Sequence, residues 1–175
     1  MDSSLLSAGI RSEVLLGLGS NMGDRLSYLS YAVNQLYKEA GKLTARSSVW
    51  ESEPWGFEAE EYFLNMVVEI STTLDPEALL SVIGAMELRL GRYRRENQGY
   101  ISRNIDIDIL FWGEKIISVP GLEVPHPHIA DRRFVLEPLN EIAADFIHPV
   151  TGRSVREMLT LCDDRSEVKL FSRAV

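Results

Sequence analysis

The chain has almost no cysteine, no excess of positive charge and no long apolar run. Cys162 is the only cysteine among 175 residues, so no internal disulfide can form, which fits a reducing compartment. Lys and Arg total 18 against 26 Asp and Glu, a formal charge of −8, which argues against a nucleic-acid binder. No segment is apolar over the length of a membrane span, and residues 1–13 lack the apolar core of a signal peptide. We therefore expect a cytoplasmic protein with a flexible leader at 1–13 and one domain over 14–175.

Residues 103–111 alternate between apolar and polar side chains with a period of two, which predicts a strand. The isoleucines would share one face of this strand, and Asp106 and Asp108 would share the other. Two neighbouring carboxylates are costly there unless positive charge compensates for their repulsion and lost hydration. Magnesium, which binds one or two carboxylates together with phosphate oxygens, is the natural partner. The alternative is the solvated outer face of an antiparallel sheet.

The segment immediately before this strand is rich in arginine. Residues 92–103 hold four arginines in an otherwise acidic protein. The planar guanidinium suits phosphate oxygens, and a loop can bring several arginines to one anion. A solvated basic loop that pairs with nearby carboxylates is the alternative.

Other segments carry side chains suited to a flat ligand. Phe63 and Asn65 would share one face of a strand, where a ring and an amide can stack on and hydrogen-bond a heterocycle. Trp55 lies in a loop with Pro54 and could wall such a ligand. Packing in the core, or anchoring of the loop, would equally explain these aromatic residues. The turn at residues 19–21 could bring backbone close to a ligand or serve as a plain turn.

Two further residues have unusual settings. Prolines on both sides of His126 fix its backbone, so that it could hydrogen-bond a phosphate, although a plain surface histidine is the alternative. Glu87 is near the end of a predicted helix, where a negative charge is unfavourable with the helix dipole. This position hints at another role for Glu87, but an ordinary solvated glutamate is the simpler interpretation.

The order of predicted elements indicates the fold class. Strands are predicted at 14–18, 44–51, 63–71 and 103–111, helices at 24–38 and 76–90, and a short C-terminal helix at 153–161. Strand, helix, strand, strand, helix, strand is the ferredoxin-like βαββαβ pattern of the α+β class. We expect an antiparallel sheet with helices on one face, followed by a C-terminal extension. The other face would then gather Phe63, Asn65, Asp106 and Asp108.

Several motifs occur in an order that resembles one enzyme family. They are Gly19-Ser20-Asn21, Pro54-Trp55-Gly56, Phe63-Leu64-Asn65, Gly91-Arg92-Tyr93-Arg94, Arg103 to Ile109, Val124-Pro125-His126-Pro127 and Arg132 to Leu136. Together they resemble the 6-hydroxymethyl-7,8-dihydropterin pyrophosphokinases of folate biosynthesis, over about residues 14–149. The resemblance implies transfer of the terminal diphosphate of ATP to the hydroxymethyl oxygen of the pterin, with release of AMP.

The resemblance also implies roles for individual residues. Asp106 and Asp108 would bind two magnesium ions, while Arg92 and Arg94 would close over the phosphates. The residues expected to contact ATP are Glu87, Arg103, Ile109, His126 and Arg132. Those expected to contact the pterin are Gly19, Ser52, Trp55, Phe63, Asn65 and Phe134. We expect a monomer whose partners are these small molecules, and neither nucleic acid nor a membrane.

Two other classes compete with this interpretation. A nucleotidyl or sugar transferase with an Asp-x-Asp pair would explain the metal site but not the Phe63, Asn65 and Phe134 side chains. A non-catalytic ferredoxin-like module that binds RNA or a protein partner would present aromatic residues on a basic sheet face. The expected face instead carries two aspartates, and the whole chain is acidic.

Overall fold

The computed structural model describes residues 10–55, 61–91, 104–173 and 175, and the predicted ferredoxin-like α+β fold is confirmed. The elements are β1 (Ser12–Ser20), α1 (Arg25–Glu39), β2 (Lys42–Arg46), β3 (Val49–Ser52), β4 (Phe63–Thr72), α2 (Pro76–Arg89), β5 (Asp106–Trp112), β6 (Ile117–Val119), β7 (Leu122–Val124), α3 (Arg133–Ala143), α4 (Val155–Leu161) and β8 (Val168–Ser172). Within these described ranges, no helix combines the length and apolar character needed to cross a membrane.

One six-stranded sheet forms the centre of the molecule, with the order β5-β1-β4-β3-β8 and with β2 also paired to β4. Its paired strands are antiparallel. The predicted strand at 44–51 is divided into β2 and β3 at Ser47 and Ser48. Both serines are buried, and the Ser47 hydroxyl accepts a hydrogen bond from the backbone N–H of Val67. Because a side chain replaces part of the strand ladder here, period-two patterning alone could not locate the break.

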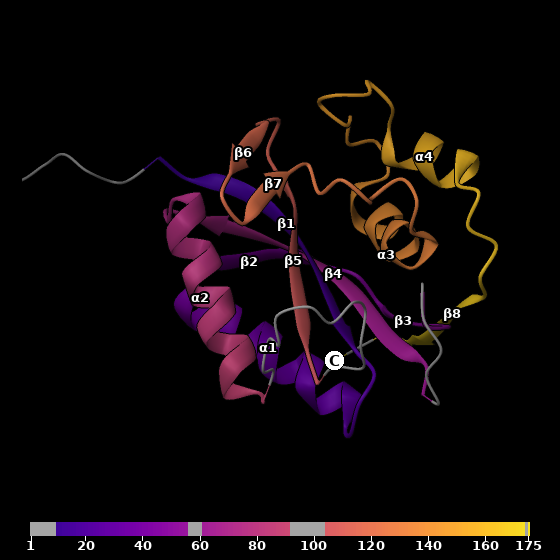
Figure 1. The fold of residues 1–175 in the computed structure, drawn as a ribbon, viewed down its shortest axis with the longest axis horizontal. Coiled ribbons are helices and arrows are strands. Elements are labelled where there is room, and N and C mark those ends of the chain that lie inside the picture. Colours follow the sequence, from indigo (N-terminus) through magenta and orange to yellow (C-terminus); the bar gives the residue numbers. More distant parts are fainter. Residues whose placement is uncertain (1–9, 56–60, 92–103, 174) are drawn as a thin grey trace, which may run out of the picture.

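Helices cover both faces of the sheet (Figure 1). The larger apolar core packs α1 and α2 against one face, as the ferredoxin-like pattern predicts. A second cluster packs α3 and α4 against the other face, on residues that include Leu15 and Val67. The predicted helix at 153–161 is confirmed as α4, whereas α3, β8 and the β6–β7 hairpin were not predicted. The C-terminal extension therefore covers part of the face that carries the candidate site.

Strand β5 alternates as predicted up to Ile109. Ile105, Ile107 and Ile109 are buried in the larger core, which turns Asp106 and Asp108 toward the opposite face. The pairing with β1 then shifts, so that Leu110 is an extra residue and both Leu110 and Phe111 contribute to the second cluster. A bulge of this kind re-aims side chains without ending the strand.

Helix α3 is joined to the sheet near its C-terminal end by one carboxylate. Glu141 accepts hydrogen bonds from the backbone N–H of Ser48 at 3.0 Å, from the Ser48 hydroxyl at 2.7 Å and from Trp50 Nε1 at 3.1 Å. Ser48 is buried, so its two donors have little access to water as an alternative partner. Glu141 therefore holds α3 against the point where β2 gives way to β3.

We predict that Glu141→Ala lowers the free energy of unfolding by about 2 kcal/mol, because the Ser48 donors lose their acceptor. Glu141→Gln, which keeps one acceptor oxygen, should lose about half as much. Urea unfolding measures both values. Asp145→Ala is the control, since its ion pair with Arg156 is solvent-exposed and contributes little. Equal stability of the Glu141→Ala and Asp145→Ala proteins would contradict the assignment.

Candidate active site

The open part of the sheet face forms a narrow cavity of about 70 Å³. Its lining comes from β1, β3, β4, β5, the 52–55 segment and the start of α3. All six residues expected to contact the pterin line it, namely Gly19, Ser52, Trp55, Phe63, Asn65 and Phe134. Asp106 and Asp108 line the same cavity. The sheet thus gathers residues that lie far apart in the sequence around one slot.

Two glycines of β1 leave space beside the aspartates. The register pairs Gly17 with Asp108 and Gly19 with Asp106, and cross-strand partners point to the same face. A Cβ atom on Gly19 would lie 3.3 Å from Asn65 Oδ1, which is closer than such contacts usually allow. Gly17 was not among the predicted site residues, although its spacing of two from Gly19 places both on one face.

The polar end of the cavity is fixed by an amide and a hydroxyl. Asn65 is buried, and its Nδ2 donates a hydrogen bond to the Ser52 hydroxyl at 2.8 Å. This bond orients the amide, whose Oδ1 lies toward Gly19. An oriented amide has a donor and an acceptor side by side, which can read the edge of a heterocycle. Phe63, two residues earlier on β4, supplies an aromatic surface to the same cavity.

Arg132, which the resemblance assigns to the ATP phosphates, lines this aromatic cavity and not the second cavity described below. Its guanidinium carbon lies 4.8 Å from the ring centre of Trp55 and 5.9 Å from that of Phe134. The residue is only 6% exposed. The guanidinium is attracted to the faces of both rings, and these contacts hold Arg132 against the wall of the cavity. Arg132 therefore brings positive charge to the part of the cavity wall formed by the start of α3.

A second, larger cavity of about 610 Å³ lies between α2, β5 and the β6–β7 region. Its apolar lining includes Leu80, Ile83 and Ile109, and its polar lining includes Glu87 and His126. Asp108 lines this cavity as well as the first one. The volume falls in the range typical of small-molecule sites. Of the residues expected to contact ATP, Glu87, Ile109 and His126 share this space, whereas Arg132 does not line it.

Glu87 is a buried residue, so its interpretation as an ordinary solvated glutamate is wrong. It is 2% exposed, and its Oε1 accepts a hydrogen bond from the backbone N–H of Ile107 at 2.9 Å. The bond joins the end of α2 to β5 between the two aspartates. The unfavourable position at the helix end was the only signal of this role in the sequence. Gly84, one turn earlier on α2, also lines the cavity and was not predicted. The sequence feature that could have indicated it is a glycine inside a predicted helix.

His126 is a neutral hydrogen-bond donor rather than an ion-pair partner. Its Nδ1 accepts a hydrogen bond from the backbone N–H of His128 at 3.2 Å, which assigns the proton to Nε2. Burial, with the nearby positive charge of Arg132, lowers the pKa of His126 to about 4. The Nε2 atom lies 4.0 Å from Asp108 Oδ2. At neutral pH the ring therefore presents an N–H beside the aspartate pair without a charge of its own.

The two aspartates fit a magnesium site better than a site made of protein ligands alone. Over residues 10–55, 61–91 and 104–173, no group of three or more His, Cys, Asp and Glu side chains could hold a metal. Two half-buried carboxylates, of which Asp108 lines both cavities and Asp106 the narrow one, leave the other ligand positions to water and substrate. Magnesium commonly binds in this way, whereas structural zinc takes four protein ligands. Arg92, Arg94 and Arg103 lie outside the described residues.

Comparisons with known proteins agree on one family. The family model described as 7,8-dihydro-6-hydroxymethylpterin-pyrophosphokinase matches residues 15–144. A Porphyromonas gingivalis protein named 2-amino-4-hydroxy-6-hydroxymethyldihydropteridine pyrophosphokinase is 45% identical over 139 residues, which are 78% of this chain and 93% of that protein. The folic acid synthesis protein fol1 of Pneumocystis carinii is 39% identical over 142 residues, which are 81% of this chain but 19% of that protein.

A solved structure shows the same fold. The wild-type HPPK-DHPS of Plasmodium falciparum with pteroate matches with a TM-score of 0.72 and 18% identity, over 90% of this chain and 43% of that chain. At this identity the likeness concerns the fold alone. This chain spans less than half the length of both that protein and the Pneumocystis carinii relative.

Proposed function

Because the chain belongs to the 7,8-dihydro-6-hydroxymethylpterin-pyrophosphokinase family, a family of enzymes, we propose that it transfers diphosphate from ATP to 6-hydroxymethyl-7,8-dihydropterin. The products are the pterin diphosphate and AMP. The observation that carries the proposal is that Asp108 lines both cavities, while Asp106 lines the narrow one beside it. A pterin in one cavity and a nucleotide in the other would meet at this carboxylate pair.

The narrow cavity suits the pterin. Phe63 from β4 and Phe134 from α3 line it and would stack on the bicyclic ring. Asn65, oriented by Ser52, would hydrogen-bond the amide edge of the pterin. Trp55 completes the wall and is itself held by the Arg132 guanidinium. This combination of flat apolar walls and one oriented amide favours a planar heterocycle over a sugar or a peptide.

The larger cavity suits the nucleotide. Leu80, Ile83 and Ile109 give it an apolar side for a base, and Gly121 and Leu122 line it from the hairpin side. The Nε2–H of His126 would donate to a phosphate oxygen at the end near Asp108. Neutral histidine suits this position, because its N–H donates a hydrogen bond to an oxygen without needing a counter-charge.

The chemistry at the junction requires positioning more than a protein nucleophile. The pterin hydroxyl oxygen would bond to the β-phosphorus and release its proton to water as the bond to the oxygen between the α- and β-phosphates breaks, and AMP would leave with that oxygen. Asp106 and Asp108 would hold two magnesium ions, which supply charge neutralisation at the attacking and leaving oxygens. Arg92, Arg94 and Arg103 would contribute further positive charge to the phosphates. No covalent intermediate is required.

The other two classes explain less of the site. A nucleotidyl or sugar transferase accounts for Asp106 and Asp108 but not for the slot formed with Phe63, Asn65 and Phe134. A non-catalytic RNA-binding module requires a basic sheet face, whereas this face carries two aspartates, and the family consists of enzymes.

We predict that the protein releases AMP from ATP only when both magnesium and 6-hydroxymethyl-7,8-dihydropterin are present. Asp106→Ala and Asp108→Ala should each reduce kcat at least about 1,000-fold, because each removes a proposed metal ligand. Thermal unfolding should change little, since neither side chain contributes to the apolar core. Chromatographic separation of AMP from ADP measures the product. Release of ADP, or AMP release without the pterin, would refute the proposed reaction.

We predict that Gly19→Ala raises KM for the pterin about tenfold while KM for ATP stays within twofold. The new methyl group would lie 3.3 Å from Asn65 Oδ1 and displace the amide that reads the ring. The comparison variant is Gly84→Ala, because its added Cβ meets nothing within 4 Å and lies beside the other cavity. Its KM for the pterin should equal that of the wild type. A parallel rise in both KM values for Gly19→Ala would show that the methyl group acts on more than the pterin cavity.

A further inference from the structure

The segment after α4 contacts two walls of the narrow cavity, although it lies outside the residues 15–144 that match the family model. One contact runs from Asp164 to the beginning of α3, and the other runs from β8 to β3. Family resemblance therefore assigns this segment no role, and its contacts must be judged on their own geometry.

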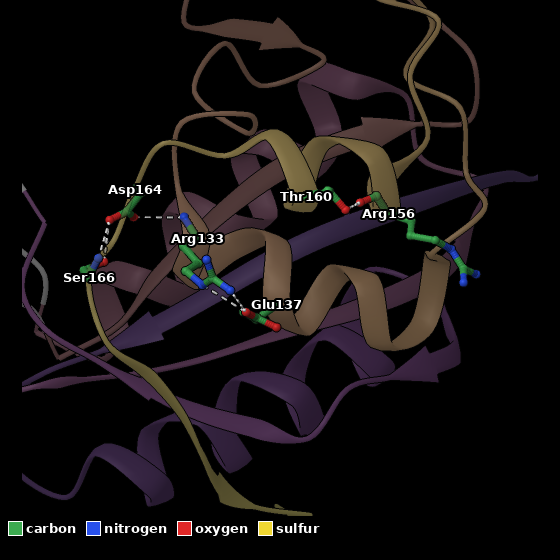
Figure 2. A network of polar contacts seen from close by, with 6 residues as sticks. All are labelled: Arg133, Glu137, Arg156, Thr160, Asp164 and Ser166. Carbon is green, nitrogen blue, oxygen red and sulfur yellow. Dashed lines mark hydrogen bonds and ion pairs between the residues drawn. The ribbon is translucent and has the colours of Figure 1, made fainter.

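Helix α3 begins without a cap from its own sequence. Arg132 occupies the N-cap position and makes no side-chain capping bond. Asp164 supplies the missing acceptor, because its Oδ2 accepts a hydrogen bond from the backbone N–H of Arg133 at 3.0 Å (Figure 2). A negative charge at a helix N-terminus is also favourable with the helix dipole. The capped residue lies between Arg132 and Phe134, the two residues through which the start of α3 lines the cavity.

Asp164 is held in place on its other side. Its Oδ1 accepts hydrogen bonds from the backbone N–H of Ser166 at 2.9 Å and from the Ser166 hydroxyl at 2.6 Å. Burial raises the pKa of Asp164, but the hydrogen bonds from Ser166 and Arg133 outweigh this and keep the pKa below its ordinary value. The Arg133 guanidinium pairs with Glu137 at 2.9 Å, as Figure 2 shows, so the contact with Asp164 is made by the backbone.

The same segment then forms the edge of the sheet beside the polar end of the cavity. Strand β8 pairs with β3, and the register places Val168 opposite Ser52. Ser52 is the residue whose hydroxyl orients Asn65. The chain from Asp164 to Val168 therefore links the aromatic wall on α3 to the strand that orients the amide.

We propose that Asp164 is a positioning residue for the pterin cavity, which sets Arg132 and Phe134 relative to Asn65 by capping α3 from the C-terminal segment. This inference rests on the proposed function for the identity of the ligand. Asp164 does not line the cavity and is not a catalytic residue; it acts through the backbone of Arg133.

The test is steady-state kinetics of the full chain with ATP, magnesium and the pterin. Asp164→Ala should raise KM for the pterin about tenfold, with KM for ATP and kcat within twofold of the wild type. Asp164→Asn, which keeps one acceptor oxygen for the Arg133 N–H, should give an intermediate KM. Asp163→Ala removes the adjacent, exposed carboxylate and should match the wild type.

A second control separates positioning from general stability. Ser154→Ala removes the capping box of α4, away from the cavity lining, and should lower Tm by about 3 °C without changing KM for the pterin. The inference is overturned if Asp164→Ala changes KM for the pterin no more than Asp163→Ala, or if Ser154→Ala raises it equally. Should Asp164→Ala fail to fold, Asp164→Asn carries the same comparison. A wild-type protein that releases no AMP would refute the proposed function instead.

Discussion

The pairing of β1 with β5 is the constraint on which the site depends. Its register sets Gly17 opposite Asp108 and Gly19 opposite Asp106, so each carboxylate has a strand neighbour without a side chain. Buried isoleucines on the other face of β5 fix which way the aspartates point. A shift by one residue would bury the carboxylates under α1 and α2, at a cost that the apolar core could not offset. The packing of the core thus determines the chemistry of the exposed face.

Helix α3 covers part of this open face and so forms one wall of the narrow cavity. It contributes Arg132 and Phe134 at its beginning and is joined to the sheet by Glu141 near its end. Asp164 from the C-terminal segment completes the support at the beginning of the helix. A wall made by one short helix can hold a ring at a defined spacing from the sheet only if both of its ends are fixed. The hydrogen bonds at the two ends provide that restraint.

The local patterns in the sequence predicted the four strands of the ferredoxin-like core, the first two helices and a shared face for Phe63, Asn65, Asp106 and Asp108, because period-two alternation and helix caps are properties of neighbouring residues. The assignment of Ser52 and Phe134 to the narrow cavity came from the family resemblance alone. The local patterns could not predict α3, since Pro138 lies inside it and the burial of Leu136 and Leu139 outweighs the lost backbone donor. Strand β8 could not be predicted either, because it is a strand by virtue of its pairing with β3. Glu87 appeared solvated because its partner, the N–H of Ile107, is 20 residues away. These three misses depend on contacts between residues distant in the sequence, whereas the β6–β7 hairpin is a local pairing that the sequence analysis did not recognise.

The most direct test of the central claim is a crystal structure of the protein with manganese, the pterin and a non-hydrolysable ATP analogue, with manganese located by anomalous scattering. Our account predicts manganese bound to Asp106 and Asp108, the pterin between Phe63 and Phe134, and the nucleotide in the cavity lined by Ile109. Manganese bound elsewhere, with both aspartates facing only water, would contradict it.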